Sequence, residues 1–146
     1  MIEELIPEVE TRYRTLGAGH RTLAGHSLAG LATVYALLRS PTEQPSFSGY
    51  IAASPTLPLA EGAIFDIERT LAENSVDMSG VLFLSVGGRE SPEMQQATAS
   101  LATILREHAY PGLTVHTLVR HGRGHGGNNW QSYIDGIRLM HEYGII

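Results

Sequence analysis

Hydrophobic residues recur along the chain in two alternating patterns. Short, largely apolar runs have the length and composition of β-strands, and they lie at 21–26, 49–54, 81–87 and 113–119. Apolar residues three or four positions apart predict helices at 2–15, 28–39, 64–74, 92–108 and after a cap at Asn128 or Asn129. Alternating strands and helices predict an α/β fold, with a parallel sheet of about four strands and helices on both faces.

Some of these segments carry further local signals. The run 81–87 is continuously apolar, as expected of a strand covered on both faces, whereas 113–119 is more polar and is expected nearer an edge. Ser91 is a favourable N-cap and Pro92 suits the first helical position, so a helix is expected to begin there. The final helix is expected to place four residues on one face: Trp130, Ile134, Ile137 and His141.

The loops that follow the strands are the expected place for a functional site, because sites in parallel sheets form at the carboxyl ends of strands. The stretch "AGHSLAG" puts Ser27 between a strand and a helix, where a sharp turn exposes its hydroxyl. The next backbone N–H, of Leu28, lies at a helix N-terminus and can donate to an oxyanion. Glu90 and His125 occupy two further strand-end loops.

These three residue types are the ones that serine hydrolysis needs. A serine hydroxyl is a weak nucleophile at neutral pH and requires a base, usually a histidine that a carboxylate orients. The order serine, acid, histidine along the chain is the one expected for an α/β fold of this kind. The pattern therefore favours Ser27 as nucleophile, His125 as base and Glu90 as acid.

Each of these residues also has a structural interpretation as a turn serine, a loop histidine or a solvated charge. Glu93 is a reserve acid, although in a first helical turn it more simply complements the helix dipole. His121 and His125 are four positions apart and suggest a metal site, but a glycine-rich loop does not hold them in one ligand geometry. His26 precedes the serine and is expected to point away from it as a packed residue.

Composition limits the classes of function. The 146 residues suit a single domain over 1–146, with 42% hydrophobic and 17% charged residues. A net charge of −5 gives no electrostatic footprint for nucleic acid or an anionic membrane. The absence of cysteine excludes disulfides, thiolate metal sites and a cysteine nucleophile. No run is long enough to span a bilayer, and the acidic start is unlike a secretory signal, so a cytoplasmic location is expected. No metal or cofactor is expected.

The motifs together resemble the α/β-hydrolase superfamily, and most closely its putative esterase branch. That branch includes catecholate-siderophore esterases, S-formylglutathione hydrolases and feruloyl esterases. The resemblance is carried by "ELIPEVETRYRT", "RTLAGHSLAGLATVYALLRSP", "YIAASPTL", "LFLSVGGRE" and "GHGGNNW". By matching position it implies Ser27 as nucleophile, His125 as base and Glu90 as acid. It also implies that the loop "SPTLPLAEG" lies beside the site, with a small apolar wall for substrate made by Leu57, Pro58 and Leu59.

Two departures from the family pattern shape the expectations. Ala29 stands where the family usually has the first glycine after the serine, while Gly30 is kept. The family's full domain has about twice as many strands, so this chain is expected to be a truncated α/β-hydrolase fold that lacks the N-terminal half. The loop that normally supplies a second oxyanion donor would be lost with it. The strand at 21–26 then becomes an apolar edge, which favours a homodimer formed through that edge.

Two functions follow as hypotheses. The first is a serine ester hydrolase for small, soluble, short-acyl esters, with Ser27, His125 and Glu90 as its triad and Leu28 N–H as an oxyanion donor. The second is a catalytically impaired remnant, or an interaction module, that keeps the family's residues by descent.

Overall fold

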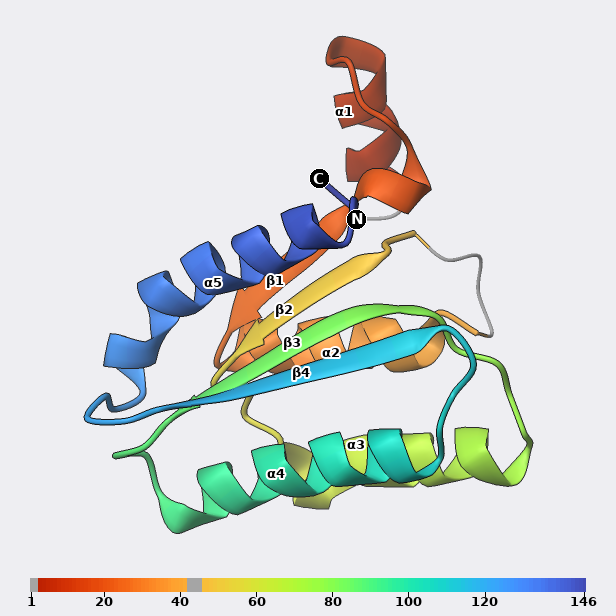
Figure 1. Ribbon diagram of the computed structural model, residues 1–146. Helices are drawn as coiled ribbons and strands as arrows, with labels where there is room; N and C mark the ends of the chain where they lie inside the picture. The colour runs from red at the N-terminus through yellow and green to blue at the C-terminus, as the bar shows by residue number, and fades with distance from the viewer. Residues whose placement is uncertain (1–2, 42–45) are drawn as a thin grey trace.

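The computed structural model describes residues 3–41 and 46–146. Within them, four parallel strands form one sheet in the order β1-β2-β3-β4 (Figure 1). The strands are β1 (Thr22–His26), β2 (Gly49–Ala53), β3 (Gly80–Gly87) and β4 (Leu113–Arg120). The helices are α1 (Leu5–Arg12), α2 (Leu28–Arg39), α3 (Leu59–Glu73), α4 (Pro92–Glu107) and α5 (Asn129–Glu142), with short 3-10 turns η1 (Ala18–His20) and η2 (Gly126–Asn128). The predicted α/β fold is confirmed.

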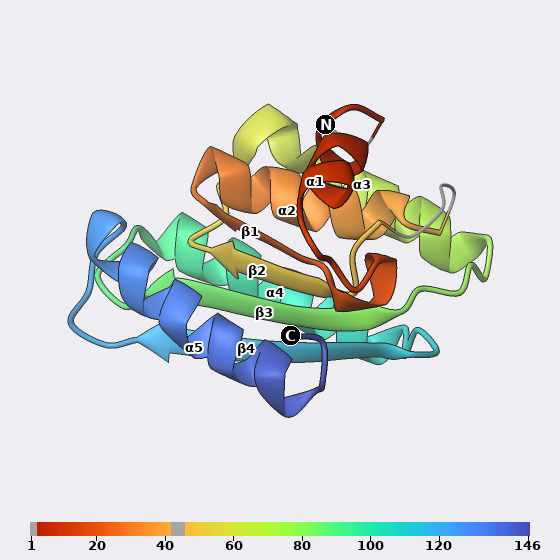
Figure 2. The same ribbon diagram turned by 90° about the horizontal axis from the view of Figure 1, so that it is seen from above.

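The order of the strands explains where the helices lie. Each new strand is added beside the preceding one, always in the same direction across the sheet. Crossovers between parallel strands are right-handed, so α2, α3 and α4 all fall on one face (Figure 1). After β4 the chain turns back, and α5 packs across β2 and β3 on the other face (Figure 2). The carboxyl ends of all the strands therefore meet at one edge of the molecule.

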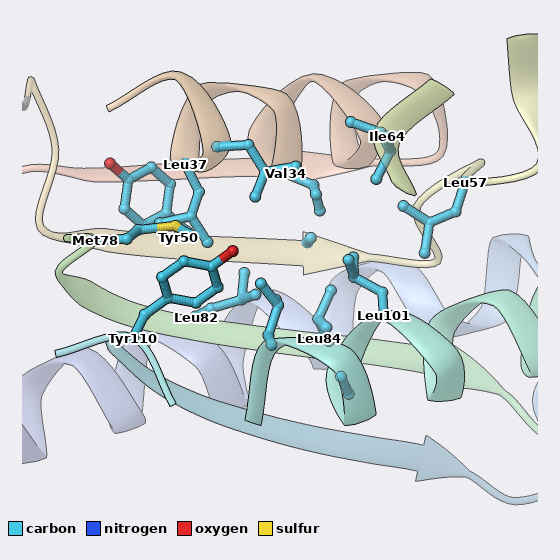
Figure 3. Close-up of a cluster of buried hydrophobic side chains, with 14 of the residues drawn as sticks. Val34, Leu37, Tyr50, Leu57, Ile64, Met78, Leu82, Leu84, Leu101 and Tyr110 are labelled. Atoms are coloured by element: carbon cyan, nitrogen blue, oxygen red, sulfur yellow. The ribbon is translucent and has the colours of Figure 1, made fainter. Parts of the chain in front are cut away.

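The described hydrophobic core falls into two clusters, one on each face of the sheet. Successive strand residues point to opposite faces, so in β2 Tyr50 and Ala52 join the cluster under α2 to α4, and Ile51 joins the cluster under α5. Figure 3 shows the larger cluster, to which helices and strands both contribute. The alternation keeps the sheet buried on both faces, as the continuously apolar run in β3 predicts.

The face of the last helix that carries Trp130, Ile134, Ile137 and His141 is not the face that α5 buries. Trp130 is 75% exposed and Ile137 is 51% exposed, whereas α5 buries Ser132, Gly136 and Met140. The reason is a close approach to β2, because a Cβ at Gly136 would lie 2.7 Å from the side chain of Ile51. Small residues let the helix lie against the sheet, so the buried face is not the most apolar one.

Helix boundaries differ from the expected ones mainly at α1 and α3. The helix predicted at 2–15 covers only Leu5–Arg12, and residues 1–2 lie outside the described part of the chain. The helix predicted at 64–74 begins five residues earlier, at Leu59, directly after Pro58. By contrast, α2 has the predicted bounds, and α4 begins at Pro92 with Ser91 accepting a hydrogen bond from the Met94 backbone N–H.

Two apolar surfaces remain uncovered at the β1 side of the molecule. Within the described sheet, β1 lies at an edge and pairs only with β2. A cavity of about 770 Å³ lies there between β1 and α2, and its lining includes Leu23, Ala24 and Tyr35. The helix α1 projects from the same end (Figure 1) and leaves Leu5 and Val9 exposed. The edge expected at 21–26 is present.

Candidate active site

The turn between β1 and α2 holds Ser27 in an unusual backbone conformation. Its φ of 60° and ψ of −119° lie in a region that residues with side chains rarely adopt. Hydrogen bonds on both sides maintain it: Ser27 N donates to Ala53 O at 3.0 Å, and Ser27 O accepts from Leu31 N at 3.0 Å and Thr56 N at 3.2 Å. Hydrogen bonds to β2, to the loop after it and to the first turn of α2 therefore hold Ser27 in this strained conformation.

Two glycines make this turn sterically feasible. A Cβ at Gly25 would lie only 2.0 Å from the backbone oxygen of Ala29, and one at Gly30 would lie 3.0 Å from Pro55 Cα. Gly25 leaves no room for a Cβ, and a Cβ at Gly30 would force the backbone at Pro55 to shift by a few tenths of an ångström. Ala29, which departs from the family pattern, is exposed and causes no comparable crowding.

Ser27, His125 and Glu90 lie in one hydrogen-bonded line. The Oγ of Ser27 is 2.9 Å from Nε2 of His125, and Nδ1 of His125 is 2.7 Å from Oε2 of Glu90. The three side chains come from the loops after β1, β3 and β4. The structure thus brings together the three residues that the sequence singles out at the strand ends.

The carboxylate of Glu90 is buried and accepts hydrogen bonds from the protein groups around it. Its Oε1 accepts hydrogen bonds from Ser54 Oγ at 2.5 Å and from Gly87 N at 2.6 Å. Burial by itself raises the pKa of Glu90, but the bonds from Ser54, His125 and Gly87 outweigh it and hold this pKa below its ordinary value. Glu90 is therefore ionised at neutral pH.

An ionised Glu90 determines which nitrogen of His125 carries the proton. A carboxylate can only accept, so Nδ1 of the neutral ring must be protonated and Nε2 is left to accept from Ser27. The ring of His26 packs against that of His125 with centroids 4.6 Å apart, and His26 Nε2 is 2.9 Å from the His125 backbone oxygen. His26 therefore supports the position of His125, in agreement with its expected role as a packed residue.

The other candidate residues lie away from this line. Glu93 is exposed in the first turn of α4, and His121 is exposed after β4. Within the described residues, no group of three or more histidine, aspartate or glutamate side chains is placed to hold a metal ion. Leu28 is the first residue of α2, so its backbone N–H lies at the helix N-terminus, directly after Ser27 in the chain.

A cavity of about 420 Å³ opens beside Ser27. Its lining residues are Ser27, Thr56, Arg89, Glu90, Ser91, Met94 and His125. The expected apolar wall is not part of this lining. Leu57 is fully buried in the core cluster under α2 to α4 (Figure 3), Pro58 caps α3, and Leu59 is half-exposed. The loop after β2 turns inward at Leu57 to close the core, and its contribution to the cavity is Thr56.

Comparison with known proteins identifies the family. A family model described as "Putative esterase" matches residues 1–141. The chain belongs to this esterase family. The resemblance expected from the motifs is therefore confirmed, and no helix in the described part of this family member is long and apolar enough to cross a membrane.

Solved structures agree with this assignment. The BES protein from Bacillus cereus matches with a TM-score of 0.80 and 26% identity, over 94% of this chain and 52% of that one. An IroE-like serine hydrolase from Shewanella oneidensis matches with a TM-score of 0.78 and 25% identity, over 95% and 45%. The siderophore hydrolase EstA from Aspergillus nidulans shares the fold, with a TM-score of 0.77 and 24% identity over 97% and 54%. The chain spans about half the length of these neighbours.

The site of this esterase-family chain contains polar residues that the sequence analysis does not single out. Thr56 Oγ1 lies 3.3 Å from Ser27 Oγ, and Ser54 and Asn128 form hydrogen bonds behind Glu90. Their sequence signals are weak, because Ser54 and Thr56 simply follow a strand in "SPT" and Asn128 is expected only as a possible helix cap. Asn128 is indeed the N-cap of α5, but its side chain makes no capping hydrogen bond, and its Nδ2 donates to Ser54 Oγ at 2.8 Å, across 74 positions of sequence.

Proposed function

We propose that the chain is a carboxylic ester hydrolase in which Ser27, His125 and Glu90 form a catalytic triad. The observation that carries the proposal is the continuous hydrogen-bonded line from Ser27 through His125 to Glu90, beside an open cavity, in a member of an esterase family. The strained turn at Ser27 acts as a nucleophile elbow, because it directs the hydroxyl out of the sheet toward the cavity.

The geometry supports a two-step acyl transfer. Ser27 Oγ attacks the ester carbonyl carbon while its proton moves to Nε2 of His125, and Glu90 stabilises the imidazolium that forms. His125 then gives the proton to the oxygen of the departing alcohol, which leaves an acyl group on Ser27. A water molecule gives up a proton to His125 and attacks the acyl carbon. His125 then returns this proton to Ser27 Oγ as the acid leaves, which restores the free serine.

The oxyanion of each tetrahedral intermediate needs hydrogen-bond donors. We assign one of them to the backbone N–H of Leu28, because the first N–H groups of a helix have no partner within it and lie at the positive end of its dipole. One such donor contributes about 10²–10³-fold in rate. We assign no residue as the second oxyanion donor. The chain matches about half the length of its structural neighbour.

The cavity favours small, short-acyl esters as substrates. Its volume of about 420 Å³ is near the lower end of the range for small-molecule sites. Arg89 is exposed and Met94 is partly buried, so the lining offers a charged and an apolar contact. A cytoplasmic location stays a prediction from the sequence.

The uncovered β1 side supports self-association as part of the proposal. A second copy of the chain would cover the open edge of β1, the adjoining cavity and the exposed apolar residues of α1, since a two-fold interface is self-complementary. Sedimentation velocity at micromolar concentration is expected to show a dimer. A monomer with full activity would contradict this part of the proposal without affecting the triad.

The hydrolytic activity is tested with 4-nitrophenyl acetate and butyrate. The native chain is expected to release 4-nitrophenol, and Ser27→Ala is expected to lose that activity. Ser40→Ala is the control, because it also removes a serine hydroxyl but at the C-terminal end of α2, away from the site. A fluorophosphonate probe, followed by peptide mass spectrometry, is expected to label Ser27 only. A native chain that neither hydrolyses the esters nor reacts with the probe is instead a non-catalytic family member.

A further inference from the structure

A second line of hydrogen bonds leads from Glu90 into the protein. Four polar residues behind Glu90 are fully buried: Ser54, Ser85, Asn128 and Ser132. Burying polar side chains is costly unless each finds partners, and all of these do. They belong to β3, α5 and the loops at the same strand ends as Ser27, so the cluster lies directly beneath the site.

The donor and acceptor roles in this cluster follow from Arg120. Its Nε donates to Asn128 Oδ1 at 3.3 Å, and Nη2 pairs with Asp135 at 2.6 Å. A guanidinium has no acceptor, so the Asn128 atom that faces it must be the oxygen. The amide NH₂ of Asn128 therefore faces Ser54 Oγ at 2.8 Å and Ser85 Oγ at 3.1 Å and donates to both.

This orientation directs the proton of Ser54. Ser54 Oγ already accepts from Asn128, so its own O–H is available for Glu90 Oε1 at 2.5 Å. Ser85 has a separate acceptor, because its hydroxyl donates to Ser132 Oγ at 2.8 Å and Ser132 donates to the Asn128 backbone oxygen. With Oε1 of Glu90 occupied, the other oxygen of this carboxylate is the one that faces His125.

We propose that Arg120, Asn128 and Ser54 are positioning residues that hold Glu90 as a carboxylate and thereby keep His125 ready to accept the proton of Ser27. We call the line Asp135–Arg120–Asn128–Ser54–Glu90 the polar relay. No proton moves along it, and its effect is to fix the direction of every hydrogen bond up to His125. The kinetic tests of this inference rest on the proposed function, whereas the NMR tests do not.

The charges around Glu90 are compatible with this role. His125 contacts Glu90 and His26 packs behind that ring. Arg89 and Glu93 are near Glu90 in the chain, and Arg120 with Asp135 stands at the far end of the polar relay. The negative charge of Asp135 is paired with Arg120 and Glu93 is exposed, so His125 is the charged group that acts directly on Glu90 and favours its ionised form.

Two substitutions test the polar relay. Ser54→Ala removes the donor to Glu90, and Asn128→Asp keeps the shape of the side chain but replaces its donor by an acceptor. Each is expected to lower kcat by about 10–10²-fold with little change in KM, because the lost bond supports a charged group. The acidic limb of kcat/KM is expected to move to higher pH, since Glu90 is then protonated more easily. Ser40→Ala, which removes one buried hydroxyl elsewhere, is expected to change neither quantity.

Nitrogen-15 and carbon-13 NMR of the resting protein test the polar relay without turnover. In the native chain the neutral His125 ring is expected to carry its proton on Nδ1, and Glu90 is expected to titrate at a higher pH in Ser54→Ala than in the native chain. Arg120→Lys, which keeps a cation for Asp135 but loses the contact to Asn128, is a milder variant if the others fold poorly. It is expected to shift the same signals by a smaller amount.

The outcomes separate the two proposals. If the native chain hydrolyses no ester but the NMR shifts occur, the proposed function is wrong and the polar relay stands. If Ser54→Ala and Arg120→Lys lower only the thermal stability, and leave kcat, the acidic limb and the NMR signals of His125 and Glu90 as in the native chain, the polar relay is wrong.

Discussion

Among the described residues, two buried glutamates each bind a histidine in almost the same geometry. In each pair, Nδ1 of the imidazole lies 2.7 Å from a carboxylate oxygen. The glutamate side chain is 2% exposed in both, and the histidine is 43% exposed in His125–Glu90 and 41% exposed in His108–Glu68. A buried carboxylate that orients an accessible histidine is therefore not by itself a catalytic arrangement.

The two pairs differ in what surrounds them. At the carboxyl ends of the strands, the second nitrogen of His125 faces Ser27 on a strained turn. At the opposite ends, His108 follows α4 and joins it to Glu68 of α3, and the hydroxyl of Tyr110 donates to the same carboxylate at 2.8 Å. Burial and Glu68 hold the pKa of Tyr110 well above its usual value, so Tyr110 stays a donor. The second pair connects helices, and the first lies in line with Ser27, the proposed nucleophile.

The two pairs are expected to differ most in the effect on kcat when their histidines are replaced. His125→Ala is expected to lower kcat for 4-nitrophenyl acetate by about 10⁴-fold or more, because Ser27 loses its base. His108→Ala is expected to leave kcat within about twofold of the native value, since distant sites act independently. Steady-state kinetics measure both, and the double variant Ser27→Ala/His125→Ala is expected to be little worse than either single one. Equal losses at the two histidines would contradict the assignment of His125.

Substitution of the carboxylates is expected to have the next largest effect. Glu90→Gln is expected to lower kcat by about 10²–10⁴-fold, since the amide neither stabilises an imidazolium nor selects the Nδ1–H form. Glu68→Gln is expected to keep kcat but to lower the free energy of unfolding by about 1–3 kcal/mol, measured by urea denaturation. Glu93→Ala tests the reserve acid, and a larger loss there than at Glu90 would overturn the choice of acid.

The strained turn, which only the first pair adjoins, is tested through its glycines. Gly25→Ala places a Cβ against the backbone oxygen of Ala29 and is expected to displace Ser27, with a loss of about 10²-fold in kcat. Gly19→Ala is the matched control, because a Cβ there meets no atom within 4 Å. Kinetics and thermal unfolding are measured together. A fully active Gly25→Ala chain would show that the turn is not what positions Ser27.

The smallest expected effect is on stability at acidic pH. Because the pKa of Glu90 is lower in the folded chain than its ordinary value of 4.5, its ionised form stabilises the fold above about pH 4.5. That contribution is lost as the pH falls from 4.5 through the lowered pKa of the folded state. The difference in Tm between the native chain and Glu90→Gln is therefore expected to shrink over this range in scanning fluorimetry. A difference that stays constant from pH 7 to pH 3 would contradict it.

Local pattern was enough to predict much of the fold and the three residues of the candidate triad. The helix α2, the cap at Ser91, the continuously apolar β3 and the parallel sheet all follow from spacing and propensity over short windows. In a parallel sheet with helical crossovers, all strand ends meet at one edge. This geometric rule brings Ser27, Glu90 and His125 to the same side before any coordinate is known.

Only the tertiary structure decided which faces are buried and which distant polar groups meet. The buried face of α5 depends on the close approach of Gly136 to Ile51, and Leu57 is a core residue because the loop turns inward there. The register of β2 against β3 pairs Ala53 with Ser85, which carries Ser54 to Glu90 and Asn128. Such contacts join residues tens of positions apart, and no local pattern encodes them. For the same reason the sequence analysis predicts Glu90 beside His125 but does not find the contact between Glu68 and His108.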